Sequence, residues 1–171
     1  MPAYRFRAAT VADLDALVEM HLELQDHLER ANPALWRMKD QARAQVKGQL
    51  HSRLTGSNNR TLVAEHEEDG IVGVVFGRVV INEHYLPSRT GMVDQLFVRA
   101  AHRRARVGSG LVAGLCAYFA GAGVEDLSLR YVAGNDEAKG FWAALGFTPR
   151  IVTVGASRLM VELQLAQAAE I

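Results

Sequence analysis

The sequence predicts an α/β fold in which a strand, a helix and a second strand follow one another. Residues 96–98 are apolar and give way at once to polar residues, as expected for a buried strand. From Val107 to Phe119 the apolar residues recur at the spacing of a helix. Leucine and tyrosine then alternate with polar residues over 127–131, which is typical of a strand in a half-covered sheet. A right-handed unit of this kind makes the two strands parallel and places the turn after the first strand at their carboxyl ends, where open α/β sheets bind ligands.

The turn between the first strand and the helix is rich in arginine and glycine. The first backbone N–H groups of a helix have no partner within it and carry the positive end of its dipole, so an anion is stabilised there. Gly108 and Gly110 lack a Cβ, and we expect both to let a phosphate approach the backbone. The arginines at 103, 104 and 106 offer forked donors that suit pyrophosphate or a 3′-phosphate. The pattern therefore predicts a phosphate-binding turn, with a solvated loop at a tight corner as the alternative.

The remaining elements complete a single domain of 171 residues. Asn32-Pro33 breaks the helical periodicity of the first third of the chain and so predicts two helices there. In chain order we expect a strand over 4–7, a helix capped by Thr10 that ends near Arg30, a helix over 38–54, a hairpin of strands over 61–64 and 71–81, a short helix after Asn135, and strands over 148–154 and 159–163.

Composition excludes several classes of function. Lys plus Arg and Asp plus Glu are both 19, so no overall field favours nucleic acid or an acidic membrane as a partner. Cys116 is the only cysteine, which excludes an intrachain disulfide and indicates a buried structural thiol. The six histidines are scattered without a metal-binding spacing, and we expect no metal. No apolar run has transmembrane length and the N-terminus has no apolar signal segment, so we expect a cytoplasmic protein.

Three segments together resemble the GNAT superfamily of acyl-CoA-dependent N-acyltransferases. RRARVGSGLV is similar to the family signature R/Q-x-x-G-x-G/A, with Arg103 in the R/Q place, Gly108 as the second glycine and Arg106 where the first glycine usually stands. RAATVADLDAL resembles the family's first strand and helix, and GNDEAKGFWAALGF resembles its N-x-x-A-x-x-[FL]-[YW]-x-x-x-G-F pattern over the full length. We expect Arg106 to take an ordinary negative φ and to point its guanidinium outward.

The resemblance implies a fold and a reaction. The fold would be one GNAT domain over 1–171, with a mixed, mostly antiparallel sheet of six to seven strands flanked by helices, and with strands four and five parallel and splayed. The reaction would be transfer of the acetyl group of acetyl-CoA, as co-substrate and without a metal, to a primary amine that attacks the thioester directly. The acceptor could be a small-molecule amine or a protein amine, and a homodimer is left open.

The resemblance also implies the residues that hold CoA. Backbone groups of Leu96, Phe97 and Val98 would pair with the pantetheine arm, which requires a gap between this strand and the next parallel one. Asn135 and Ala138 would line the wall near the CoA arm. The pyrophosphate would bind mainly to main-chain N–H groups of the turn, formed by Arg103, Arg104, Ala105, Arg106, Val107, Gly108, Ser109 and Gly110.

The residues that would act as acid and base follow less directly from the sequence than the residues that would hold CoA. Trp142 stands where many family members have an acidic tyrosine, and its indole cannot serve as an acid, so we interpret it as a packing wall for the pantetheine. Asp94 would share a face with Leu96 unless a bulge re-aims one of them, and its carboxylate is a candidate general base. The alternative is that Asp94 has a structural role, either as a cap or as the partner of an arginine. His84 and Tyr85, in a polar loop at a strand end, compete with it for the catalytic role.

Two other classes of function stay open at this point. One is a catalytically silent acyl-CoA-binding or interaction domain of the same fold, because fold alone does not prove chemistry. The other is a nucleic-acid-binding domain that uses the arginine turn, which the absence of interleaved stacking aromatics disfavours.

Overall fold

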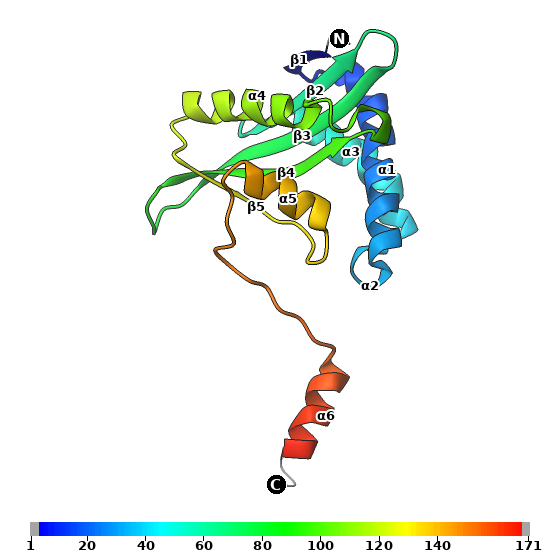
Figure 1. Ribbon diagram of the computed structural model, residues 1–171, viewed down its shortest axis with the longest axis vertical. Helices are drawn as coiled ribbons and strands as arrows, with labels where there is room; N and C mark the ends of the chain where they lie inside the picture. Colours follow the sequence, from blue (N-terminus) through cyan, green and yellow to red (C-terminus); the bar gives the residue numbers. More distant parts are fainter. Residues whose placement is uncertain (1–3, 169–171) are drawn as a thin grey trace. The chain divides into compact units, whose positions relative to one another are not determined.

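The computed structural model describes residues 4–168, which form one compact unit up to Arg130 and a second from Tyr131 onward. The first unit holds every strand of the described residues: β1 Tyr4–Ala8, β2 Asn59–His66, β3 Gly70–Ile81, β4 Arg89–Val98 and β5 Asp126–Leu129. Its helices are η1 Val11–Asp13, α1 Leu14–Ala31, α2 Pro33–Trp36, α3 Asp40–Thr55, η2 Ala100–His102 and α4 Val107–Gly121 (Figure 1). The second unit holds α5 Asp136–Ala144 and α6 Arg158–Ala168. None of the helices within residues 4–168 has the length and apolar character needed to cross a membrane.

The strands form one mixed sheet in the order β1-β2-β3-β4-β5. The first three pairings are antiparallel and β4 pairs with β5 in parallel, as predicted. The sheet has five strands in the described part of the chain, so the expectation of six to seven is wrong.

The two predicted C-terminal strands are absent from the described residues. Residues 148–157 form neither helix nor strand, and the segment from Arg158 is helix α6 instead. Pro149 has no N–H to give to a strand ladder, which explains the first error. Leucine, methionine, glutamate, glutamine and alanine dominate α6 and are strong helix formers, which explains the second.

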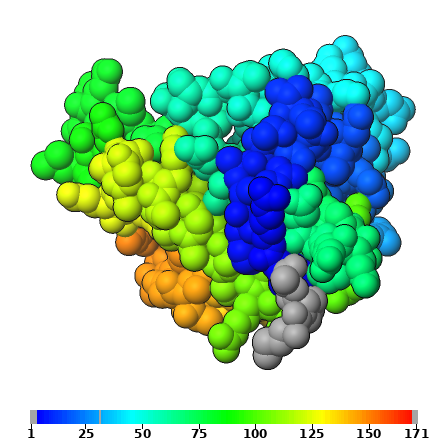
Figure 2. Space-filling model, turned by 90° about the horizontal axis from the view of Figure 1, so that it is seen from above, coloured from blue at the N-terminus to red at the C-terminus, as the bar shows by residue number. Residues whose placement is uncertain are grey.

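Helices cover both faces of the sheet (Figure 1). On one face, α1 and α3 pack against the central strands and build a core that includes Leu17, Met20 and Phe76. On the other face, α4 crosses β1 to β4 and buries Leu115 and Phe119. Figure 2 shows the blue surface of β1 beside the yellow-green surface of α4. The sheet therefore lies between two layers of helices, and the carboxyl end of β4 leads into the turn before α4.

The parallel pairing at the edge of the sheet is short. β5 pairs with β4 only through Thr90 to Val93, although β4 continues to Val98. The register between β3 and β4 also shifts at this point, because Phe76 lies opposite Gln95 while Gly77 lies opposite Val93. Asp94 is thus an extra residue in β4, and such a bulge bends and twists its strand.

The start of the chain is fixed by a partly buried ion pair. Both Asp13 carboxylate oxygens accept hydrogen bonds of 2.8 Å from the guanidinium of Arg7, and the Thr10 N–H donates to the same carboxylate at 2.7 Å. These interactions lower the pKa of Asp13 from 3.8 to about 2, mainly through the Arg7 hydrogen bonds. The Asp13 carboxylate therefore joins β1 to the beginning of α1.

Asp13→Asn should lower the free energy of unfolding at pH 7 by about 2 kcal/mol, which is the equivalent of this pKa change. Because the folded-state pKa is the lower one, the contribution is complete above pH 3.8 and is lost as the pH falls toward 2. Denaturant unfolding between pH 2 and 7 measures it. Asp15→Asn is the matched control, since the Asp15 side chain is 86% exposed and should change stability by no more than about 0.5 kcal/mol. Equal losses in the two variants would contradict the assignment.

Candidate functional site

The open edge of β4 is the first part of the candidate site. Within residues 4–168, β4 has no strand partner on its β5 side beyond Val93. The predicted pantetheine-binding residues Leu96, Phe97 and Val98 lie in this segment, while β3 pairs with its other side. The β4–β5 pairing therefore ends before the predicted pantetheine-binding residues, and the backbone edge of β4 is left without a strand partner to which an extended ligand could pair as a sheet accepts a strand.

The turn before α4 is the second part. The first hydrogen bond of α4 runs from the Gly110 N–H to the Arg106 carbonyl at 3.0 Å, so the N–H groups of Val107, Gly108 and Ser109 have no acceptor within the helix. Val107 can offer only its backbone, because its side chain is buried against the sheet. Residues 104–106 and Ser109 are exposed. The turn thus presents N–H groups and arginine side chains to solvent together.

Two arginines in this turn have left-handed backbone conformations. Arg104 has φ 63° and Arg106 has φ 62°, so the expectation of a negative φ at Arg106 is wrong. A left-handed residue at this position explains why a glycine suits it, since only glycine adopts that conformation without a steric cost. The family's first glycine was the signal that could have predicted this backbone.

Arg103 and Gly110 have contacts that the sequence did not reveal. The Arg103 Nε donates to the Val98 carbonyl at 3.1 Å and so closes the end of β4. At Gly110, a Cβ would lie 2.3 Å from the Phe6 ring. The structure therefore explains Gly110 by the close approach of α4 to β1, whereas we had expected it to give access to a phosphate.

Asp94 is held by two arginines on the face of the sheet that α1 and α3 cover. One carboxylate oxygen accepts a hydrogen bond from the Arg53 guanidinium of α3, and the other accepts from the Arg78 Nε at 3.0 Å. The bulge places Asp94 on this face, whereas Leu96 lies opposite Val75 on the α4 side. The bulge that we had named as the exception to a shared face therefore re-aims Asp94 away from the face of Leu96. The arginine pairing that we had kept as an alternative is what the structure shows.

His21 is a functional candidate that the sequence interpretation missed. It lies on α1 beside Gln95 and Arg53, and its Nδ1 is buried without a hydrogen-bond partner among the described residues. Burial lowers the pKa of His21, the neighbouring Gln95 amide opposes that effect, and the charge of Arg53 adds to the lowering. His21 is therefore a neutral imidazole at neutral pH. Its position on the apolar face of the amphipathic helix α1 was the available signal.

A cavity of about 830 Å³ opens between α1, α3 and the end of β4. Phe97, Ala100 and Arg103 line it beside the phosphate turn. Its other walls carry charges of both signs, from Glu23, Asp26, His27, Glu29, Arg30 and Arg43. The volume is within the range of about 300–1,000 Å³ that is usual for small-molecule sites.

The structure does not bring His84 and Tyr85 to this place. Both follow β3 in the loop that leads to the start of β4, whereas the open edge and the turn lie at the other end of that strand. Their backbone N–H groups donate to the Asn82 side chain at 3.0 and 3.1 Å, and Tyr85 is 75% exposed.

The predicted residues of the second unit are ordered around α5. The Asn135 Oδ1 accepts from the Ala138 N–H at 3.0 Å and caps the helix, as the sequence predicts. Trp142 is buried and packs edge-on against Phe141 and Phe147, which fits a packing role. That Asn135, Ala138 and Trp142 contact CoA remains a prediction from the family pattern.

The chain belongs to the acetyltransferase (GNAT) family, whose sequence profile matches residues 21–147. No curated protein sequence gives a match.

Solved structures share the fold at low sequence identity. The BH1408 protein of Bacillus halodurans, as a tetramutant, superposes with a TM-score of 0.80 at 19% identity, over 90% of this chain and 99% of its own. The aminoglycoside acetyltransferase meta-AAC0020 from an uncultured soil metagenomic sample, in complex with sisomicin, gives 0.69 at 17% identity, over 90% and 95% of the two chains. The aminoglycoside N-acetyltransferase AAC(6')-Iy, in complex with CoA, gives 0.71 at 14% identity, over 92% and 97%.

Arg106→Gly should raise the free energy of unfolding by about 0.5–1 kcal/mol, because glycine relieves the left-handed strain and loses part of that gain to its own chain entropy. Denaturant unfolding measures the change. Ala105→Gly is the control, since Ala105 has no such backbone strain and should be destabilised slightly. The CoA affinity that the family resemblance implies should fall by about tenfold or less in Arg106→Gly, the effect of one lost charge-assisted contact. Destabilisation by Arg106→Gly equal to that of the control would contradict the strain.

Proposed function

We propose that this protein is an N-acetyltransferase that transfers the acetyl group of acetyl-CoA to a primary amine. The observation that carries the proposal is the open edge of β4 leading through the arginine turn into the start of α4, where the first N–H groups have no acceptor within the helix. Pantetheine is extended and rich in amides, and pyrophosphate is an anion, so the two features match the two parts of CoA in the order in which they are joined. Membership of the acetyltransferase family supports the same substrate.

In this proposal the pantetheine arm pairs with the backbone of Leu96, Phe97 and Val98. The pyrophosphate lies on the first N–H groups of α4, with Arg104 and Arg106 available to its outer oxygens. The thioester then lies near the bulge, because that is where the gap between β4 and β5 begins.

We assign the acceptor amine to the cavity between α1 and the end of β4. Its lining includes Phe97 and Arg103, so it adjoins both parts of the CoA site. A primary amine is an ammonium in water, and the carboxylates of Glu23, Asp26 and Glu29 favour its approach. The size of the cavity and the aminoglycoside acetyltransferases among the structural neighbours support a small-molecule amine rather than a protein terminus.

The amine must lose its proton to attack the thioester, and we assign His21 as the group that accepts this proton, directly or through one water. A neutral imidazole can take a proton, whereas both Asp94 oxygens already accept from arginines. Asp94 then orients Arg53 beside His21. His84 and Tyr85, which we had considered for this role, lie in the loop before β4.

Thiol release tests the function. The chain, acetyl-CoA and a panel of primary amines that includes aminoglycosides should release CoA thiol above the rate without acceptor. Gly108→Glu should abolish CoA binding measured by calorimetry, because it adds bulk and negative charge at the phosphate site. Gly48→Glu is the control, since Gly48 lies on α3 with open space around it. CoA binding without transfer to any amine would instead favour the silent acyl-CoA-binding alternative.

The base assignment has its own test. His21→Gln should lower kcat/KM by on the order of a hundredfold while CoA affinity is preserved. In the unmodified protein, kcat/KM should fall only below pH 6.5, because burial places the pKa of His21 below that ordinary value and the proton acceptor must be neutral. This acid limb should disappear in His21→Gln.

A larger loss in Asp94→Asn, with the acid limb unchanged in His21→Gln, would return the role of base to Asp94.

A further inference from the structure

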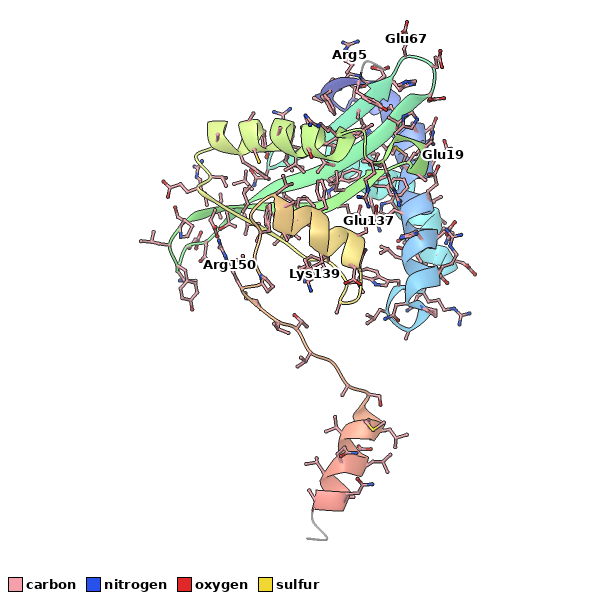
Figure 3. The ribbon with its side chains drawn as sticks, viewed as in Figure 1. Arg5, Glu19, Glu67, Glu137, Lys139 and Arg150 are labelled. Carbon is pink, nitrogen blue, oxygen red and sulfur yellow. The ribbon has the colours of Figure 1, made fainter. Side chains whose placement is uncertain are left out.

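Three side chains of metal-ligating type converge at the end of the sheet where β2 turns into β3. His66 is the last residue of β2, Asp69 lies in the turn, and His102 belongs to η2 after β4. One ligand atom from each lies within 4.8 Å of the other two. Figure 3 shows this end of the sheet, where Glu67 of the turn and Arg5 of β1 project. The fold thus joins histidines that are far apart in the sequence, which is why their spacing gave no metal pattern.

The distances around Asp69 suit a shared cation. Its Oδ2 lies 3.0 Å from the His66 Nδ1 and 3.3 Å from the His102 Nε2. Ligand atoms bound at about 2.0–2.2 Å in a tetrahedral zinc site are separated by about 3.3 Å, so two of the three separations already fit. The third separation, between one nitrogen of each imidazole, is no more than 4.8 Å.

Tyr4 contacts the ring nitrogen of His102 that does not face Asp69. The Tyr4 hydroxyl lies 3.1 Å from the His102 Nδ1, which leaves the Nε2 directed toward Asp69. A metal-binding histidine usually donates its other N–H to a carboxylate, a carbonyl or a water, and the Tyr4 oxygen can accept in the same way, which fixes the orientation of the ring. Tyr4 reaches this position because the β1–β2 register places it opposite His66.

Burial distinguishes the two histidines from surface residues. The side chains of His66 and His102 are 12% and 11% exposed, and their ring centroids lie 5.0 Å apart. Two imidazoles at this distance can bind one cation together with the carboxylate between them. Asp69 is 54% exposed, so the site is open to an ion from solvent.

We propose that His66, Asp69 and His102 bind one divalent transition-metal ion, with Zn²⁺ as the best match to two imidazoles and one carboxylate. Mg²⁺ and Ca²⁺ prefer sets of oxygen ligands, which this cluster does not offer. The ion would fasten the β2–β3 turn to η2, the segment that leads into Arg103 and the phosphate turn. The site is separate from the residues assigned to acetyl transfer, and the inference stands without that function.

Calorimetric titration of the metal-stripped, tag-free chain with ZnCl₂ tests the site, and Co²⁺ absorption reports its geometry. We expect one ion per chain, tetrahedral Co²⁺ bands and a Zn²⁺-dependent rise in Tm. Asp69→Asn, His66→Gln and His102→Gln should each weaken Zn²⁺ binding by about a hundredfold or more, and Tyr4→Phe by about tenfold, as expected for removal of a supporting partner.

His51→Gln is the matched control, because His51 is exposed on α3 away from the cluster, and it should bind Zn²⁺ as the unmodified chain does. Absence of binding at 100 µM Zn²⁺ (roughly −5.5 kcal/mol in affinity) by the folded chain would overturn the proposal. Unchanged binding in Asp69→Asn would overturn it equally. That variant alters an exposed side chain and so keeps the test valid if either histidine variant fails to fold.

Discussion

The loss of pairing between β4 and β5 after Val93 is the constraint on which the candidate site depends. A continuous ladder would use the backbone groups of residues 94–98 within the sheet and leave none for a ligand. The extra residue at Asp94 shifts the register against β3 and bends β4 where β5 stops following it. The right-handed connection through α4 then places the phosphate turn at the end of the same open segment.

The bulge also determines which side chains face α1 and α3. It turns Asp94 toward Arg53 and Arg78, so a carboxylate that would otherwise lie on the α4 side becomes the centre of a charged cluster beside the apolar core. Arg53 additionally lies over the Phe76 ring, with its guanidinium carbon 5.1 Å from the ring centroid. The polar cluster is thus supported by the core, and it keeps His21 and Gln95 next to the place where the strands separate.

The sequence predicted the parts of the fold that follow from local periodicity. Apolar spacing located α1 and α4, and the break at Asn32-Pro33 separated α1 from the more polar helix α3. β-rich runs on either side of a turn signal located β2 and β3, and alternation located β5, within a few residues. The short helix after Asn135 was found because its cap is a local hydrogen bond. The prediction of a strand over 159–163 was wrong because this leucine-rich run fits both the helical and the strand period. Its residues also have strong helix propensity, and they form part of α6.

The part of the candidate site that could be predicted from the sequence is the part formed by one continuous stretch of backbone. The turn around Gly108 could be recognised because a strand end, glycines and a helix start are adjacent in the chain. The left-handed Arg106, the Phe6 contact of Gly110 and the arginines around Asp94 depend on contacts between distant segments. No periodicity reports such contacts, and a histidine such as His21 on an apolar helix face was the only trace of the cluster in the sequence.

The four-residue pairing of β5 has a consequence for how the sheet opens. β3 is bonded on both sides along most of its length, whereas β5 is an edge strand bonded to one neighbour over Thr90 to Val93 alone. Local opening is cheapest where few hydrogen bonds and contacts must break, so the amides of β5 exchange with solvent deuterium sooner than those of β3. A molecule that filled the gap beside β4 would cover backbone amides of residues 94–98, and slower exchange there would report its presence independently of any chemistry.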